Sequence, residues 1–147
     1  MLTMNKSNQP VVSTTVTTMQ WSRAQLAAFS TADDFQVSPF YSDGQTYGTP
    51  TWIWSVVVGQ QLFIRAWNGP RSRWYRSAVT QRAGRIHLAE SNHLVNFVPI
   101  CDEQLNNQID QAYRQKYAGS PYLMPMLASG PRQATVQVMP RISKKGE

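Results

Sequence analysis

The part of the chain best supplied with groups that could bind a ligand is GPRSRWYRSAVTQRAGR, residues 69–85. It holds five arginines, one tryptophan and one tyrosine, and it has no Asp or Glu. Guanidinium groups near hydroxyls and backbone N–H groups are the combination that binds phosphate and other oxyanions. Aromatic rings beside them could flank a flat ligand. The segment therefore predicts an anion site next to aromatic side chains.

The excess positive charge of the whole chain lies around the same segment. The sequence of 147 residues has a net charge of +6, from 14 Lys and Arg against 8 Asp and Glu. Between Asp43 and Glu90 there are six arginines and no acidic residue, while eight basic residues balance eight acidic ones elsewhere. This distribution favours a local anion site over a generally basic surface.

Side chains for acid–base, nucleophilic or metal chemistry are scarce. His87 and His93 are the only histidines and Cys101 is the only cysteine, so we expect no metal site and no internal disulfide. A β-hairpin over this region puts the two histidines on opposite faces. Neither has an acidic residue expected beside it, and Cys101 is expected to be a buried spacer. An enzyme of this composition would depend on a cofactor for its chemistry.

The length and the hydropathy pattern predict one domain with two tails. Residues 1–20 lack the apolar core of a secretory signal and are expected to form a tail. The single domain is expected over residues 21–141, and residues 142–147 are interpreted as a charged tail. No apolar run approaches the roughly 20 residues that span a bilayer, and a lone cysteine fits a reducing compartment. We expect a cytoplasmic protein without membrane contact.

A helix and a hairpin are expected before the arginine-rich segment. Ser22 and Gln25 form a capping box in front of a helix from Arg23 to about Thr31. Period-two patterns then predict strands, and Gly59-Gln60 predicts a tight turn between two of them. Both faces of that hairpin are largely apolar, which indicates a central place in a barrel. The expected strands cover residues 35–41, 51–58, 61–67, 85–90, 93–100 and 134–140.

The elements after the segment complete the predicted architecture. A second hairpin is expected to turn at Ser91-Asn92. Residues 102–117 predict a helix with a buried stripe, which consists of Leu105, Ile109, Ala112 and Tyr113. The order of helix, about five strands, helix and strand indicates an α+β fold, mainly an antiparallel β-barrel with short flanking helices.

Two resemblances follow from these motifs. TWIWSVVVGQQLFIRAWNGPRSRWYRSAVTQRAGRIHL resembles the strand, hairpin, arginine, turn and Trp-Tyr arrangement of flavin- and deazaflavin-binding split β-barrel proteins, the pyridoxamine-phosphate-oxidase-like superfamily. More closely, WSRAQL, RWYRSA, AYRQKY and VQVMPR resemble the bacterial family catalogued as domain of unknown function 2255. This likeness runs from about Trp21 to Arg141. It implies a split β-barrel that is usually a homodimer.

The resemblance also implies a cofactor site. Arg65, Ser72 and Arg73 would hold the phosphate of FMN or a deazaflavin. Trp74 and Tyr75 match the Trp-Tyr pair of the deazaflavin branch. The next two residues of this chain are Ser and Ala after Arg76, where that branch has an Asn-Leu pair, so the sequence leaves the identity of the cofactor open.

Three functions stay open at this point. The first is an FMN- or deazaflavin-dependent oxidoreductase, or a cofactor-binding protein, with the ring in a cleft between protomers. The second is a barrel that binds a small anionic or aromatic ligand without redox chemistry. The third and least favoured is nucleic-acid binding, because the arginines occupy one short stretch. In each case Trp67, Trp74 and Tyr75 either flank a flat ring or complete the core.

Overall fold

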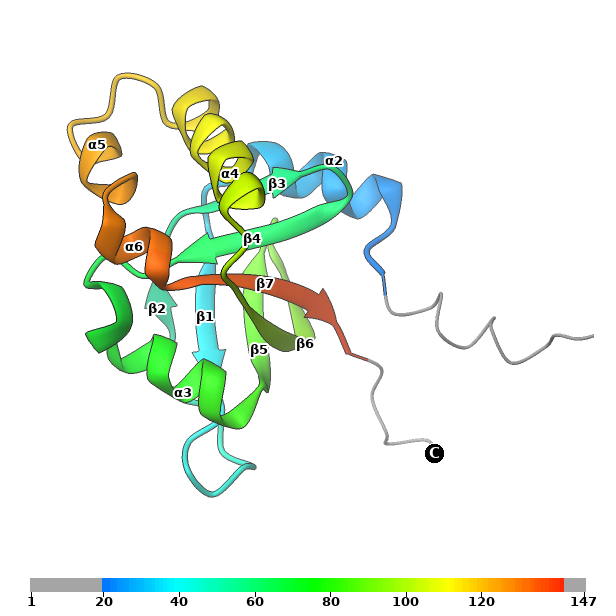
Figure 1. Cartoon of the computed structure of the whole chain (residues 1–147). Helices are drawn as coiled ribbons and strands as arrows, with labels where there is room; N and C mark the ends of the chain where they lie inside the picture. The colour runs from blue at the N-terminus through cyan, green and yellow to red at the C-terminus, as the bar shows by residue number, and fades with distance from the viewer. Residues whose placement is uncertain (1–19, 142–147) are drawn as a thin grey trace, which may run out of the picture.

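The computed structural model describes residues 20–141 (Figure 1). The predicted tails, residues 1–20 and 142–147, lie outside the described residues except for Gln20. The elements follow in this order: α2 Arg23–Thr31, β1 Gln36–Pro39, β2 Thr51–Trp52, β3 Ser55–Val58, β4 Gln61–Arg65, the 3₁₀ turn η1 Gly69–Arg71, α3 Arg73–Gln81, β5 Ala83–Leu88, β6 Ser91–Ile100, α4 Glu103–Lys116, α5 Leu123–Met126, α6 Ser129–Gln133 and β7 Thr135–Pro140.

The seven strands form one curled sheet, a half-barrel, so the predicted α+β class is confirmed. The strand order is β2-β1-β5-β6-β7-β4-β3, and each of its six pairings is antiparallel. β2 and β3 follow each other in sequence but lie at opposite ends of this order. The prediction of one strand over residues 51–58 was therefore wrong. The strand is interrupted at Ile53 and Trp54, where the chain passes from one edge of the sheet to the other.

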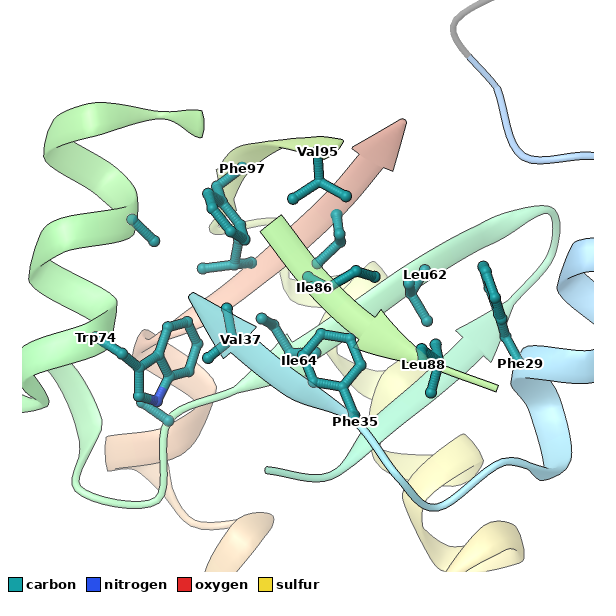
Figure 2. Close-up of a cluster of buried hydrophobic side chains, with 14 of the residues drawn as sticks. Phe29, Phe35, Val37, Leu62, Ile64, Trp74, Ile86, Leu88, Val95 and Phe97 are labelled. Atoms are coloured by element: carbon teal, nitrogen blue, oxygen red, sulfur yellow. The ribbon is translucent and has the colours of Figure 1, made fainter. Parts of the chain in front are cut away.

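The main hydrophobic core lies on the inner face of the half-barrel. Figure 2 shows side chains from β1, β4, β5 and β6 meeting there, with Phe29 entering from α2 and Trp74 from α3. The residues with the least exposure in this core include Phe35, Val37, Leu62, Ile64, Ile86, Leu88, Val95 and Phe97. The burial of these large apolar side chains stabilises the packing of the short strands against α2 and α3.

A second core lies on the other side of the β3–β4 hairpin. Val56 and Phe63 are buried there against Ile109 and Tyr113 of α4, and Figure 1 shows α4 over this hairpin. The apolar residues on both faces of the hairpin were predicted correctly. Their interpretation as a central barrel pair was wrong, because β3 is the last strand of the sheet and a helix covers its second face.

Local signals correctly predict the ends of α2 and α4. The Ser22 hydroxyl accepts a hydrogen bond from Gln25 N at 3.0 Å, and the Gln25 side chain accepts one from Ser22 N at 2.8 Å. Asp102 caps α4 by accepting from the backbone N–H of Gln104 at 3.0 Å. These bonds satisfy amides that the first turn of a helix leaves free.

The β5–β6 hairpin turns two residues earlier than predicted. Its turn residues are Ala89 and Glu90, both with positive φ, 53° and 64°. The Asp34 carboxylate accepts hydrogen bonds from both turn amides, each at 2.8 Å, and so stabilises a backbone shape that usually requires Gly or Asn. His93 pairs with Ile86 in this register. The two histidines therefore do lie on opposite faces, as predicted.

The arginine-rich segment contains a helix that the predicted element order omits. α3 buries Trp74 and Ala78, one turn apart, and leaves Arg73 and Arg76 exposed. It ends at Arg82, which has a left-handed φ of 64°. The apolar spacing of four residues is the helical signal. It was missed because the arginines in and around this segment suggested a binding loop.

Candidate functional site: an aromatic cleft beside a buried arginine

Arg65, which was predicted to bind a phosphate, is fully buried at the end of β4. Its Nε donates to Thr135 Oγ1 at 3.0 Å. Nη1 donates to Asp110 Oδ1 at 2.6 Å and to the Met126 carbonyl at 3.2 Å. Nη2 donates to the carbonyl and the Oδ1 of Asn106 at 3.1 and 2.9 Å. A guanidinium has five N–H donors, so Arg65 has none left for a ligand.

The charge of Arg65 is balanced inside the same network. The second oxygen of Asp110 accepts a hydrogen bond from Arg132 Nη1 at 2.5 Å. Arg132 in turn pairs with Glu103 at 2.9 Å. This network joins β4, α4, α6 and β7, and its centre is removed from water. Arg65 is therefore a structural residue that holds these elements together.

An open cleft lies beside Arg65, with a volume of about 350 Å³. It is lined by Trp52, Ile53, Trp54, Arg65, Trp67, Tyr122 and Met126; we call it the aromatic cleft. Trp52 is 66% exposed, Tyr122 60% and Trp67 47%. Exposed large aromatic side chains gathered around one hollow are typical of ligand sites and interfaces.

Some rings of the aromatic cleft contact other aromatic side chains. Trp54 stacks face to face on Tyr117, with ring centroids 3.9 Å apart and planes 4° from parallel. The Tyr117 hydroxyl donates to the carbonyl of Ser55 at 3.2 Å, which fixes the stack on β3. Trp67 and Tyr122 meet edge to face at 5.8 Å. The orientation of Trp54 is therefore set without a ligand, and Trp67 and Tyr122 contact each other.

The structure divides most of the residues predicted for the cofactor site between two cavities. Arg65 and Trp67 both line the aromatic cleft. Arg73 and Trp74 line a different cavity. The remaining two lie in neither lining: Ser72 is the buried residue before α3, and Tyr75 donates to the Gln133 carbonyl at 3.4 Å. Burial, and to a smaller extent Cys101, raises the pKa of Tyr75.

Three aromatic residues of the cleft were missed by sequence reasoning. Trp52 and Trp54 fell within the strand predicted over residues 51–58 and were not considered as ligand contacts. The run of three large apolar residues from Trp52 to Trp54 does not fit the alternation of a half-exposed strand, and it could have drawn attention to them. Tyr122 lies in a segment rich in Gly and Pro, and no local pattern distinguishes it from a surface tyrosine.

The histidines and the cysteine occupy ordinary structural positions. His87 Nε2 lies 3.5 Å from Asp34 Oδ2, so an acidic neighbour does exist, although that carboxylate also caps the turn. His93 contacts Trp21 edge to face at 5.3 Å, and burial, followed by His87, lowers its pKa. Cys101 is exposed, which makes the buried-spacer prediction wrong. Within residues 20–141, no group of three His, Cys, Asp or Glu could hold a metal ion.

Lys116 forms a half-buried tie between α4, α2 and β3. Its Nζ donates to the carbonyls of Phe29 at 3.3 Å and Ser55 at 2.9 Å. Burial lowers the pKa of this ammonium from 10.5 to about 8, although Asp33 and Asp34 oppose the shift. The folded chain therefore releases this proton at a lower pH than the unfolded chain does.

The low pKa of Lys116 predicts a pH-dependent stability. Between about pH 8 and pH 10.5 the unfolded chain binds this proton and the folded chain does not, so the lysine's contribution to the free energy of unfolding rises with pH. We expect wild type to gain stability relative to Lys116→Met over this range, as measured by urea unfolding at a series of pH values. Parallel pH profiles of the two proteins would contradict the assignment.

No helix within residues 20–141 has the length and apolar character needed to cross a membrane. Residues 25–138 match the model of the bacterial family described as "Uncharacterized protein conserved in bacteria (DUF2255)". The chain is a member of this family. The matched residues include the whole aromatic cleft and the Arg65 network. No curated protein and no solved structure matches the chain.

Proposed function

We propose that this DUF2255 chain is a split β-barrel that binds a small planar aromatic ligand in the aromatic cleft, with FMN and a deazaflavin as the first candidates. The observation that carries the proposal is the set of three exposed rings, Trp52, Trp67 and Tyr122, around an open volume of about 350 Å³. That volume lies within the usual range of small-molecule sites, about 300–1,000 Å³.

The walls of the cleft support a flat, uncharged ring as the bound group. Trp54 presents a ring that is already locked against Tyr117, and Trp67 is held by Tyr122. Each aromatic contact contributes about 0.5–1.5 kcal/mol beyond the burial of its area. Rings that keep their orientation lose little conformational entropy on binding. The isoalloxazine or deazaflavin ring has the required shape.

The same walls do not fit a phosphate group. Arg65 is the one charged side chain lining the cleft in the described part of the chain, and all five of its donors are engaged. A phosphorylated cofactor would therefore place its ring in the cleft and its phosphate outside it. A bound flavin or deazaflavin would supply hydride-transfer chemistry, and the protein would hold and shield the ring.

Tryptophan fluorescence provides a direct test with riboflavin, FMN and 5-deazariboflavin. We expect saturable quenching by at least one of them, with affinity reduced about tenfold or more in Trp52→Ala and in Trp67→Ala. Val98→Ala removes part of an exposed apolar side chain outside the cleft and should leave the affinity unchanged. Binding that survives both tryptophan substitutions would refute the site, and lack of saturation with all three compounds would refute the flavin assignment.

A planar ligand without redox chemistry is the second candidate. The neutralised charge of Arg65 favours it, because the cleft then offers apolar contacts and no free cation. Indole serves as a neutral planar probe in the same titration. Quenching by indole that is lost in Trp67→Ala, together with indifference to the flavins, would favour this candidate over the cofactor.

The split-barrel proposal includes a homodimer. Trp52 supports it, since a side chain of this size that is two-thirds exposed on an end strand is the kind of surface that a second copy covers. Sedimentation velocity at micromolar concentration should give the mass of a dimer. A monomer at concentrations up to about 100 μM would exclude the stable dimer and leave the cleft to a ligand alone.

A further inference from the structure

A further cavity, with a volume of about 260 Å³, is lined by residues from β1 to Thr51 of β2 and from the start of α3. It shares no lining residue with the aromatic cleft. It lies between the loop that follows β1 and the beginning of α3. Its lining consists of Pro39, Tyr41, Gly48, Thr49, Thr51, Arg73, Trp74 and Ser77; we call it the hydroxyl cavity.

The hydroxyl cavity has one cationic group and no acidic one. Arg73 has no acidic partner within residues 20–141, in contrast to Arg65 and Arg132. The nearby loop does contain Asp43, but its carboxylate already accepts from the backbone of Gln45 and Thr46, each at 2.9 Å. The guanidinium of Arg73 is therefore free to pair with an anion that enters from solvent.

Four residues that carry hydroxyl groups line the same cavity: Tyr41, Thr49, Thr51 and Ser77. The Tyr41 and Thr49 hydroxyls lie 3.1 Å apart, and the Tyr41 hydroxyl also accepts from the backbone N–H of Thr49 at 3.2 Å, so they form one polar wall. Ser77 follows Arg73 by one helical turn, which puts both on the same side of α3. Thr51 Oγ1 donates to the Thr49 carbonyl at 3.4 Å, so the hydroxyls left to donate to an oxyanion beside the guanidinium are that of Ser77 and one of the Tyr41–Thr49 pair.

The direction of α3 adds to this preference. The cavity lies at the N-terminal end of a nine-residue helix, where the backbone N–H groups carry partial positive charge. Ser72 precedes the helix, is 8% exposed and makes no capping hydrogen bond with its side chain. The first turn of α3 therefore keeps N–H groups that its own cap does not satisfy.

The part of the lining formed by the loop after β1 depends on a close backbone approach. Gly48 N donates to the Pro39 carbonyl at 2.8 Å. A Cβ at Gly48 would lie only 2.8 Å from that same carbonyl oxygen. Only glycine therefore lets the loop lie this close to β1 at the wall of the cavity that contains Gly48 and Thr49.

We propose that the hydroxyl cavity is an oxyanion site that binds the phosphoryl group of a small phosphorylated compound. Arg73 supplies the charge, while Ser77 and the Tyr41–Thr49 hydroxyl pair supply neutral donors. This site is distinct from the aromatic cleft and does not depend on a ligand there.

Two-dimensional NMR of the ¹⁵N-labelled full chain with inorganic phosphate and phenyl phosphate tests the site. We expect saturable shifts of the Gly48, Thr49 and Ser77 amides, with affinity about tenfold or more lower in Arg73→Ala. Arg76→Ala is the matched control, because it removes an exposed arginine of the same helix that does not line the cavity. Its affinity should stay within about twofold of wild type.

Further arms of the titration separate the site from general electrostatic attraction. Sulfate should compete with phosphate, whereas chloride at equal ionic strength should not. Equal losses in Arg73→Ala and Arg76→Ala, or shifts spread along all exposed arginines, would overturn the proposal. Riboflavin carries no phosphate, so its affinity for Arg73→Ala should equal that for wild type. If riboflavin binds neither protein, the aromatic-cleft proposal fails, and the phosphate titration still tests the hydroxyl cavity.

Discussion

Asp110→Asn should lower the free energy of unfolding by about 3–5 kcal/mol, the usual cost of removing one partner from a buried ion pair. Asp110 accepts from Arg65 at 2.6 Å through one oxygen and from Arg132 at 2.5 Å through the other. The substitution leaves the fully buried guanidinium of Arg65 without its counter-charge and replaces one acceptor by an NH₂ donor. Urea unfolding followed by circular dichroism measures the loss.

Glu103→Gln provides the matched control for this prediction. Glu103 pairs with Arg132 at 2.9 Å, but its side chain is 82% exposed. An ion pair in that position contributes about 0–1 kcal/mol. Comparable losses in the two variants would show that water reaches Asp110 and that Arg65 is not the central structural charge. Arg65→Lys should also be destabilising, because an ammonium cannot replace five donors in a fixed plane.

The elements that sequence reasoning predicted well are those whose signals are local. The capping box of α2 and the turn at Gly59-Gln60 depend on residues within a few positions of each other. The predicted alternation of side-chain faces in β3 and β4 was also correct, since the residues on their two faces pack into two different cores. Such patterns report which face is buried. They do not report what covers it, and this is why α4 was not expected outside the hairpin.

Apart from α3, whose signal is local, the mispredicted elements depend on distant contacts. The turn at Ala89-Glu90 has no Gly or Asn, and its positive φ values are supported by Asp34, 55 and 56 positions away. The break between β2 and β3 reflects the closing of the half-barrel, which places neighbouring residues at opposite ends of the sheet. No window of the sequence contains both partners of these contacts.

The candidate site divides in the same way. The free arginines and the tryptophans could be recognised by type, and the structure does place Arg73 and Trp67 at cavities. The fate of Arg65 could not be predicted, because its acceptors are 41 to 70 positions away in α4, α5 and β7. From the sequence alone, an arginine at the end of an apolar strand could serve a functional or a structural role. Its hydrogen-bond partners decide between the two roles.

Gly84→Ala should cause a loss of stability of about 3 kcal/mol, at the upper end of the usual cost of overpacking. Gly84 lies in β5 opposite Pro39 of β1. A Cβ there would meet the Pro39 Cα and the Ser38 carbonyl oxygen, both at 2.6 Å, and the Phe97 ring at 3.2 Å. Two of these three atoms belong to the backbone and cannot move away without separating β1 from β5.

Gly130→Ala separates this steric effect from the general effect of replacing a glycine. A Cβ at Gly130 would have no neighbour within 4 Å, and its position in α6 favours Ala over Gly. Thermal unfolding should therefore show Gly130→Ala at or above the wild-type midpoint and Gly84→Ala roughly 10 °C below it. Equal midpoints for the two variants would mean that the sheet yields at Gly84. The close approach of β1 to β5, which sets the curvature of the half-barrel beside the hydroxyl cavity, would then be an adaptable feature of the fold.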